Sequence, residues 1–567
     1  MAQTQTSDKN RWLLIVSVMA LGLISLVQHG CDSDSSNVFV PASPSIPTPP
    51  PLPSAITAVS PLQNSDTALV SALVSASFSN DMNGATFTTS TFTLTTGGAP
   101  VTANVSYDVT TKTATLTPAS DLVTATEYRA TISSVVEDAA GTRPLTADFV
   151  WSFTISPATA LVSKDSNAVV GNDVSARSAI DASGRYIVFE SEATNLASAA
   201  TTFNRNHIYR KDTVSGEVVL VSSDAAGLEA NNNSASPRIS DDGRYVVFES
   251  LATNLSSIST GGTRQVYLKD LADDSVDLVS RTTDPVVADN SAENPDVSND
   301  GRYIVFESNA TNLSALGTTG ASQIYRKDMT DDTIDMISRN TTQTAGGNGS
   351  SNRPHMSADA RYIVFDSAAN DISVAATSSV RSVYLIDVMN PDTIELISVD
   401  TLGTQGNGAS IGASISDDGN FIAFESQATN LIAGGTTLSD IYRRDRSRNQ
   451  TLLVSTPDGI ISSNDASVGA SINGDGRYVA FVSAATNLVT ETSLGLNDIF
   501  VRDLSTLPTV TLAKINLTQT GAEATDNSAN ASISSDGRYV SFDSAFNYDI
   551  SDTNTINDIY RSLNSTF

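Results

Sequence analysis

The octapeptide DDGRYVVF, residues 241–248, is the clearest copy of a phrase that returns seven times along the chain. A fixed period of 57 to 61 residues separates the copies, which is typical of solenoids and β-propellers. The Asp-Gly pair predicts a tight hairpin, in which glycine takes a positive φ and aspartate bonds the turn backbone. Departures at Ala360 and at Asn420-Phe421 predict altered turns in the fourth and fifth repeats. The central positions are Gly184, Gly243, Gly301, Ala360, Gly419, Gly476 and Gly537.

Residues on both sides of this turn give each repeat four strands. An apolar residue such as Ile239 lies four positions before the turn residue, and a run such as residues 244–248 follows it. A third strand centres on an aromatic residue such as Tyr267, and a fourth reads like residues 278–280. Four strands make a propeller blade, although this repeat is longer than the roughly 40–45 residues of a WD-type blade.

The seventh repeat lacks a fourth strand, and a segment of that type, residues 160–163, precedes the first repeat instead. If this segment pairs with the last blade, the ring closes by a one-strand exchange and leaves no open edge. The sequence therefore predicts an all-β chain with a seven-bladed β-propeller over residues 157–567.

A second module precedes the repeats. Polar and apolar residues alternate in segments 72–78, 113–117 and 149–153. Such alternation over about 100 residues predicts a two-sheet β-sandwich, here over residues 55–156. We expect Trp151 and Tyr128 to pack in its core rather than to face a ligand.

Both modules resemble known families. Residues 55–156 are similar to the SbsA-type bacterial Ig-like domain, on phrases such as VSP at 59–61, FSNDM at 78–82 and WSF at 151–153. That resemblance implies a spacer or adhesion module of a surface protein. The repeats resemble TolB-type β-propeller repeats, whose S-x-D-G-R-Y-x-x-F core is legible in six or seven copies. This second resemblance implies a fold and is nearly silent on activity.

The first 30 residues have the layout of a signal peptide. Two basic residues precede an apolar run, residues 12–27, and Gly30 precedes the only cysteine, Cys31. The arrangement resembles a bacterial lipoprotein signal, which implies lipidation of Cys31, although Gln28 stands where a lipobox usually has leucine. The alternative is a plain signal peptide, or an uncleaved anchor, with an incidental thiol. The run is short for a spanning helix, which needs about 20 residues.

Residues 31–54 contain seven of the 19 prolines of the chain. A Pro/Ser-rich stretch of this kind tends to extended polyproline conformation and acts as a linker. Signal, linker and Ig-like module together predict an exported protein of the bacterial cell envelope. A lipid at Cys31 would anchor it to a membrane, on the periplasmic or cell-surface face.

The charge balance restricts the partners. The 567 residues include 62 acidic and 32 basic side chains, for a net charge of −30. Nucleic acid requires clustered Lys and Arg, so it is not expected as a partner. The single cysteine excludes an intramolecular disulfide and a Cys-based zinc site. Much of the acidity belongs to the repeated Asp-Gly turns.

Six repeats carry arginine directly after the turn, and six carry aspartate a few residues past the third-strand aromatic residue. A pair repeated in nearly every blade predicts a structural bridge rather than a binding site. The arginines are Arg185, Arg244, Arg302, Arg361, Arg477 and Arg538, and the aspartates are Asp212, Asp270, Asp328, Asp387, Asp445 and Asp503.

In antiparallel blades the loops from second to third strand, and from fourth strand to the next blade, lie on one face. These loops are the long ones, such as residues 308–322 and 280–295, and we call their side of the propeller the long-loop face. Loops of this kind commonly bind ligands. Polar clusters in them could hold Ca²⁺, but we favour Asx turns and predict no metal or cofactor. The clusters are Asn172-Asp173, Asn232-Asn233, Asp289-Asn290, Asn464-Asp465, Asp526-Asn527, and Asp552-Thr553-Asn554 with Asp558.

No catalytic residue is predicted. The phrase H-E-x-x-H and the P-loop are missing from the sequence. Prolyl-oligopeptidase-like enzymes share this repeat type but add a C-terminal hydrolase domain, which we do not expect because the last repeat reaches the end of the sequence. Some seven-bladed lyases use propeller histidines with a metal, and His207 and His355 are too far apart in sequence to suggest such a cluster.

The sequence therefore predicts a non-catalytic envelope protein whose propeller binds a protein or a polysaccharide through the long-loop face. One alternative is a glycan-cleaving lyase or hydrolase, with paired carboxylates at the mouth of the propeller channel. Another is a purely structural role.

Overall fold

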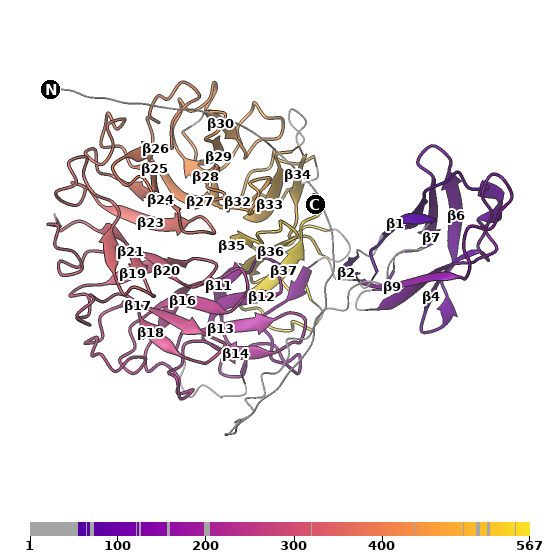
Figure 1. The fold of residues 1–567 in the computed structure, drawn as a ribbon, viewed down its shortest axis with the longest axis horizontal. Helices are drawn as coiled ribbons and strands as arrows, with labels where there is room; N and C mark the ends of the chain where they lie inside the picture. Colours follow the sequence, from indigo (N-terminus) through magenta and orange to yellow (C-terminus); the bar gives the residue numbers. More distant parts are fainter. Residues whose placement is uncertain are drawn as a thin grey trace, which may run out of the picture. The chain divides into compact units, whose positions relative to one another are not determined.

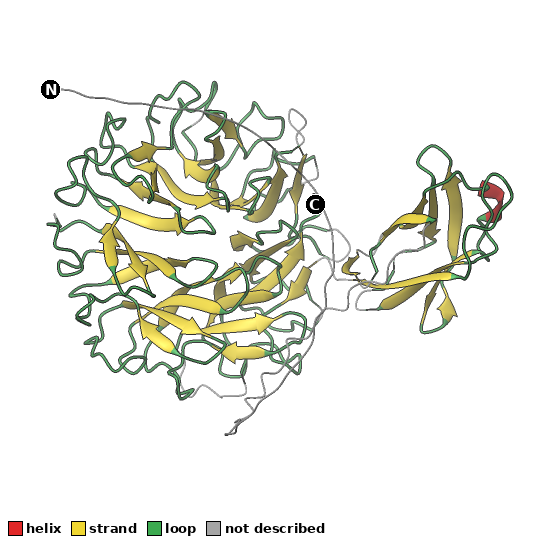
Figure 2. Cartoon of the chain, viewed as in Figure 1, coloured by secondary structure: helices red, strands yellow, loops and turns green. Residues whose placement is uncertain are grey.

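The computed structural model describes residues 55–567 apart from 64, 69–72, 121, 124–125, 156–158, 198–204, 319, 436, 491–492, 506–510, 519–521 and 550. Within these residues the one helix is a short 3₁₀ turn, η1 (Gly84–Thr86), and the rest of the regular structure is strand (Figure 2). The predicted all-β fold is confirmed. The predicted signal peptide and linker, including Cys31 and Gln28, lie outside the described residues.

The first nine strands form two sheets, with the orders β1-β3-β7-β6 and β2-β9-β8-β4-β5. Side chains along β3 are alternately buried and half-buried, because successive residues of a strand point to opposite faces. The two-sheet sandwich agrees with the sequence prediction. The strands are β1 (Ile56–Ser60), β2 (Ser65–Ala68), β3 (Val74–Phe78), β4 (Phe92–Thr96), β5 (Ala99–Pro100), β6 (Ala103–Asp108), β7 (Thr113–Pro118), β8 (Glu127–Ile132) and β9 (Phe149–Ile155).

Aromatic residues dominate the core of this sandwich. Trp151 and Tyr128 are both buried, and the Trp151 ring lies 5.9 Å from that of Phe92. The polar atoms of these rings have partners: Trp151 Nε1 donates to the Pro61 carbonyl at 3.0 Å, and the Tyr128 hydroxyl accepts from the backbone of Val123 at 2.9 Å. Both aromatic residues are therefore core residues, as predicted.

The described residues from Thr159 to Leu563 form seven four-stranded antiparallel sheets, which we call blades and number by their first strands (Figure 1). First strands are β11 (Ser175–Ile180), β15 (Ser234–Ile239), β19 (Ala292–Val297), β23 (Ser351–Met356), β27 (Ser410–Ile415), β31 (Ser467–Ile472) and β35 (Ser528–Ile533). Second strands are β12 (Tyr186–Ser191), β16 (Tyr245–Ser250), β20 (Tyr303–Ser308), β24 (Tyr362–Ser367), β28 (Phe421–Ser426), β32 (Tyr478–Ser483) and β36 (Tyr539–Ser544). Third strands are β13 (His207–Asp212), β17 (Gln265–Asp270), β21 (Gln323–Asp328), β25 (Ser382–Asp387), β29 (Asp440–Asp445), β33 (Asp498–Asp503) and β37 (Asp558–Leu563). Fourth strands are β14 (Val218–Leu220), β18 (Val276–Leu278), β22 (Ile334–Met336), β26 (Ile394–Leu396), β30 (Gln450–Leu453), β34 (Thr511–Lys514) and, for the last blade, β10 (Thr159–Leu161).

The blades form a closed ring. Each first strand contacts the first strand of the next blade, and β35 contacts β11. The last blade takes its fourth strand from the start of the region, because β10 pairs antiparallel with β37. The one-strand closure is confirmed, although the strand begins one residue earlier than predicted. Val162 and Ser163 follow β10 and still hydrogen-bond to the backbone of Ile559.

The turns between first and second strands share one geometry. All six turn glycines have φ between 70° and 79°. In the second blade the Gly243 N–H donates to the Ser240 carbonyl at 2.9 Å, and Asp242 Oδ1 accepts from the Arg244 N–H at 3.0 Å. The predicted roles of glycine and aspartate in the turn are confirmed.

The expectation of altered turns in the fourth and fifth blades is wrong. Ala360 takes a φ of 56° and donates its N–H to the Ser357 carbonyl at 2.8 Å, as the glycines do. In the fifth blade Asp418 Oδ1 accepts from the Asn420 N–H at 2.9 Å. The Ser-x-Asp hydrogen bonds therefore fix the turn, and the left-handed strain of alanine, about 1–2 kcal/mol, is tolerated.

Five blades contain the predicted Arg–Asp ion pair, with N–O distances of 2.6 to 2.8 Å. The other two differ, because Asp445 pairs with Arg448 at 3.1 Å and Arg538 pairs with Asp536 of its own turn at 2.7 Å. Every pair joins elements of one blade, which agrees with a structural role. The five are Arg185–Asp212, Arg244–Asp270, Arg302–Asp328, Arg361–Asp387 and Arg477–Asp503.

Candidate functional site

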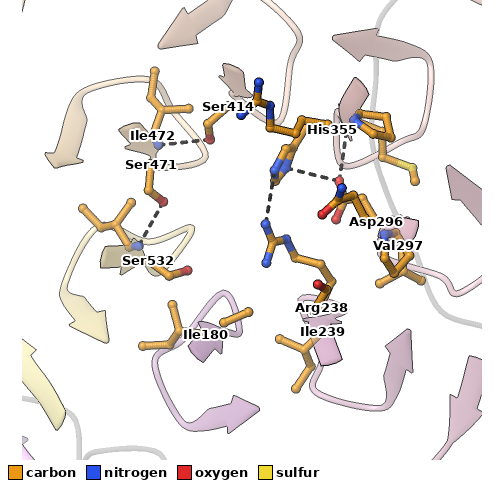
Figure 3. A pocket seen from close by; sticks show the side chains of 18 of the residues that line it. Ile180, Arg238, Ile239, Asp296, Val297, His355, Ser414, Ser471, Ile472 and Ser532 are labelled. Carbon is orange, nitrogen blue, oxygen red and sulfur yellow. Dashed lines mark hydrogen bonds and ion pairs between the residues drawn. The ribbon is translucent and has the colours of Figure 1, made fainter. Parts of the chain in front are cut away.

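The first strands and their turns line a central cavity of about 660 Å³, which we call the channel (Figure 3). This volume is within the range of small-molecule sites, about 300–1,000 Å³. Residues common to all blades hold the repeat together, so the candidates for a specific site are the lining positions at which the blades differ. Three layers of side chains follow one another, from the long-loop face to the Asp-Gly turns.

The first layer lies at the bulge of each first strand, where the third residue has a φ of 50° to 67°. The bulge N–H is held by a carboxylate on the second strand of the preceding blade. For example, the Ser236 N–H donates to Glu190 Oε1 at 2.8 Å, and the Asn294 N–H donates to Glu249 Oε2 at 2.9 Å. The sixth blade has Val482 at the position of this carboxylate. The carboxylates that make this bond are Glu190, Glu249, Glu307, Asp366, Glu425 and Asp543.

These bonds explain part of the acidity of the propeller. Burial raises the pKa of Glu307 and of Asp543, while hydrogen bonds to backbone N–H groups oppose that rise. A buried backbone N–H without a partner costs about 1–3 kcal/mol, so the carboxylates stabilise contacts between blades. They are structural residues, although some of them face the channel.

The second layer contains the ionic centre of the channel, built from the second, third and fourth blades. Arg238 Nη2 lies 3.4 Å from His355 Nε2, and His355 Nδ1 lies 3.5 Å from Asp296 Oδ2 (Figure 3). A guanidinium can only donate. His355 Nε2 is therefore the acceptor, and its proton is on Nδ1, facing Asp296.

The imidazole of His355 is neutral at physiological pH. Burial in the channel wall lowers its pKa to about 4, since the charged form is poorly solvated there and Arg238 lies beside it. Only 28% of the side chain is exposed, and it lines the channel. Asp296 also accepts the backbone N–H of Met356 at 3.0 Å, so its carboxylate is fixed between two blades.

The opposite wall of this layer is made of serines from the last three blades, Ser414, Ser471 and Ser532 (Figure 3). Ser414 accepts the Ile472 N–H at 3.2 Å, and Ser471 accepts the Ile533 N–H at 3.2 Å. A hydroxyl that accepts one bond keeps its own proton for donation. This wall therefore offers hydroxyl donors to the channel.

The third layer lies at the Asp-Gly turns. The Ser535 hydroxyl donates to Asp417 Oδ2 at 2.9 Å, and Asn299 donates its side-chain amide to Asp241. Burial, together with repulsion from Asp417, raises the pKa of Asp241 to about 6. Burial also raises the pKa of Asp417. Two carboxylates of high proton affinity thus lie at this end.

The two histidines of the propeller have different environments. His207 begins β13 and is buried, with Nδ1 3.2 Å from the Ser222 hydroxyl and Nε2 3.6 Å from Glu229. The third strands of the next two blades begin with Gln265 and Gln323, which bond the equivalent serines, so His207 is a structural residue. His355 alone lines the channel. Within the described ranges no group of three or more His, Cys, Asp and Glu side chains is arranged to hold a metal ion.

The polar clusters of the long loops bond their own backbone. Asp173 Oδ1 accepts from the Val174 N–H at 2.9 Å, and Asp465 Oδ1 accepts from the Ala466 N–H at 2.7 Å. Asn232 and Asn290 do the same in the second and third blades. Each of these bonds goes to the N–H of the next residue, whereas an Asx turn uses the N–H two residues on, so the side chains bond their own loops in a different geometry from the predicted Asx turn.

Asp552 and Asp558, the other Ca²⁺ candidates, belong to the last blade. Asp552 accepts from the hydroxyl of Tyr560. Asp558 accepts from the hydroxyl of Ser163 at 2.6 Å, beside the closing strand β10. Both carboxylates therefore take part in the hydrogen bonds of the ring closure.

Sequence patterns alone did not single out Arg238 and Asp296 as site residues. The sequence signal that could have found them is the fifth residue of each first strand. This residue is serine in three blades, and it is arginine, aspartate or histidine in three others. Among the described residues no helix is long and apolar enough to cross a membrane.

Comparison with known protein families supports the Ig-like module. Residues 50–155 match a model of the bacterial Ig-like domain family, which confirms the Ig-like resemblance. No curated protein matches the chain.

The solved structures that are similar to the chain include TolB proteins and other β-propellers. A putative TolB from Agrobacterium tumefaciens has a TM-score of 0.32 and 15% identity, over 50% of this chain and 80% of its own. The β-propeller domain of the Trilobed protease from Pyrococcus furiosus has a TM-score of 0.41 and 11% identity, over 69% of this chain and 95% of its own. An oligogalacturonate lyase in complex with manganese has a TM-score of 0.40 and 11% identity, over 73% and 92%.

Proposed function

We propose that this protein is a non-catalytic protein of the bacterial cell envelope, whose propeller binds a protein or a polysaccharide through the long-loop face. The envelope location is supported by the signal layout of residues 1–30, the linker at 31–54 and the Ig-like module. In this proposal a lipid on Cys31 anchors the chain to a membrane.

The observation that carries the proposal is where large apolar side chains are exposed. In the described part of the propeller, the side of the short connectors and Asp-Gly turns exposes three of them, Val214, Met389 and Phe567. The long loops expose many more, and exposed apolar clusters rimmed by polar residues typically mark interaction surfaces. Those of the long loops are Val169, Val174, Leu228, Val286, Val374, Leu402, Leu438, Ile460, Ile461 and Leu494.

The fifth and sixth blades concentrate this apolar surface. Ile460 and Ile461 are 72% and 57% exposed, in the loop between the two blades. This loop bonds the next long loop, because the Asn464 side chain donates to the Thr486 hydroxyl at 2.8 Å. Leu494, farther along that second loop, is 61% exposed. Side chains that stay mostly exposed on a hydrogen-bonded loop bury little apolar surface in the fold, and they are available to a partner.

A second candidate function, glycan cleavage in the channel, is favoured by Asp241 and Asp417. Glycosidases use two carboxyl groups, one of them an acid with a raised pKa. Burial raises the pKa of both residues, and that of Asp241 reaches about 6. Against this role, Asp417 accepts a bond from Ser535, and Asp241 accepts one from Asn299. These partners hold both carboxylates in a structural network.

The experiment is capture of partners from an envelope extract by the full-length protein and by two double variants. Ile460→Asp/Ile461→Asp places charge on the long-loop face, and Val214→Asp/Met389→Asp places the same charge on the short connectors. We expect the first variant to lose the proteins or polysaccharides that the wild type captures, and the second to keep them.

Equal capture by all three proteins would refute the proposal. Release of oligosaccharides from an envelope polysaccharide, abolished by Asp241→Asn, would establish the glycan-cleaving alternative instead.

A further inference from the structure

Three of the seven fifth residues of the first strands share one hydrogen bond between neighbouring blades, and Arg238 is among those that do not make it. In the third, fifth and sixth blades this side chain accepts the backbone N–H of the next blade: Asp296 from Met356, Ser414 from Ile472, and Ser471 from Ile533. Arg238 cannot accept a hydrogen bond, so it cannot take part in this contact. Its side chain extends into the channel instead (Figure 3).

Arg238 lacks a negative partner within the part of the chain that the structure describes. It has five N–H donors; one bonds the Pro237 carbonyl at 3.2 Å and one bonds His355 at 3.4 Å. Both acceptors are neutral. Most other arginines that face the first layer are paired, for example Arg353 with Asp366 at 2.8 Å and Arg264 with Glu249. Arg238 is therefore a half-buried, channel-facing charge with unused donors.

The His355–Asp296 contact holds Arg238 in place. Asp296 fixes the imidazole through Nδ1, and His355 Nε2 then accepts from Arg238. A guanidinium held in one orientation loses less conformational freedom when it binds an oxyanion, and the pairing is often bidentate. The hydroxyls of Ser414, Ser471 and Ser532 lie on the opposite wall, where they can bond further oxygen atoms.

We infer that the channel binds a small hydroxylated organic acid, whose carboxylate pairs with Arg238 and whose hydroxyl groups bond the serine wall. Because carboxylates outnumber guanidiniums in the lining, a doubly charged ion such as sulfate is repelled more strongly than an acid with one carboxylate. This site is separate from the long-loop surface and does not depend on the proposed partner. The charged lining residues are Arg177, Arg238, Arg353, Asp241, Glu249, Glu293, Asp296, Asp417 and Glu425.

The test uses three probes on the full-length protein: D-gluconate, the neutral polyol D-glucitol, which has the same number of carbons, and sulfate. Calorimetry should show gluconate binding with a dissociation constant of about 1 mM, and glucitol and sulfate binding at least about tenfold more weakly. Arg238→Gln should weaken gluconate binding about tenfold, as expected for loss of a charge-assisted hydrogen bond. Arg143→Gln, which makes the same charge change in the Ig-like module, should leave it unchanged.

A second measurement needs no variant that could misfold. The chain has three histidines, and of the two that the structure describes, His207 and His355, only His355 lines the channel. Gluconate should shift the NMR signals of the His355 ring and leave those of buried His207 unchanged. The inference is overturned if gluconate does not bind, if it binds no better than glucitol, or if the His355 signals do not move. Ile460→Asp/Ile461→Asp should bind gluconate like the wild type, which separates this test from that of the proposed function.

Discussion

Replacement of Gly243 by alanine should destabilise the propeller more than replacement of a matched glycine. Gly243 has a φ of 74°, and a Cβ built on it would lie 2.1 Å from the Tyr186 ring of the preceding blade. Gly216 has a φ of 81°, and nothing lies within 4 Å of a Cβ at that position. Both substitutions therefore introduce left-handed strain, and only the first introduces a collision between blades.

The two costs can be separated. Left-handed backbone costs a residue with a side chain about 1–2 kcal/mol, which is the expected effect of Gly216→Ala. At Gly243 the aromatic ring must also move by more than an ångström, and overpacking of this kind costs about 1–3 kcal/mol. Gly243→Ala should therefore lower the free energy of unfolding by about 2–5 kcal/mol.

Urea unfolding of both variants, followed by circular dichroism, measures this difference. The chain has two tryptophans: Trp151 is in the Ig-like core, and Trp12 lies outside the described residues. Trp151 fluorescence therefore reports the Ig-like module and should be unchanged in both variants. If Gly243→Ala is no less stable than Gly216→Ala, packing of turns against the preceding blade is not what holds neighbouring blades together.

Two further predictions concern buried carboxylates. Burial raises the pKa of Asp558 from 3.8 to about 6, so its contribution to stability is present below pH 3.8 and is lost as the pH rises through 6. At pH 8 the Asp558→Asn variant should be more stable than the wild type by up to about 3 kcal/mol, and near pH 3.5 the two should be equally stable. Thermal unfolding across this pH range measures the difference, and identical pH profiles for the two proteins would contradict the prediction. Glu307→Ala removes the acceptor of the Arg353 N–H, at 2.6 Å, and should cost about 1–3 kcal/mol in urea unfolding. Val482→Ala, at the position without a carboxylate, should show only the smaller loss expected for shortening a buried apolar side chain.

The sequence predicted the parts of the fold that repeat. The spacing of the turn glycines predicted the strands of each blade. The lack of a fourth strand in the seventh repeat predicted that β10 pairs with β37 to close the ring. The altered turns expected around Ala360 and Asn420 did not appear, because backbone and serine–aspartate bonds fix the turn whichever residue occupies the variable positions. A turn motif that repeats in every blade can be recognised in a single sequence, because each copy supports the interpretation of the others.

The channel site could not be predicted in the same way. Arg238, Asp296 and His355 belong to three blades, and no spacing in the sequence shows that their side chains meet. His207 and His355 look equivalent in the sequence, yet one is buried within a blade and the other lines the channel. Which side of a first strand faces the channel depends on the bulge, and the register shift at that bulge has no signature in a single sequence.

The most direct test of the account is the affinity of the captured partner, protein or polysaccharide, for the full-length protein and its variants. Loss of two exposed apolar anchors should weaken binding by at least about tenfold in Ile460→Asp/Ile461→Asp. Val214→Asp/Met389→Asp, on the short connectors, should bind like the wild type. An unchanged affinity in the first variant, or an equal loss in both, would contradict binding through the long-loop face.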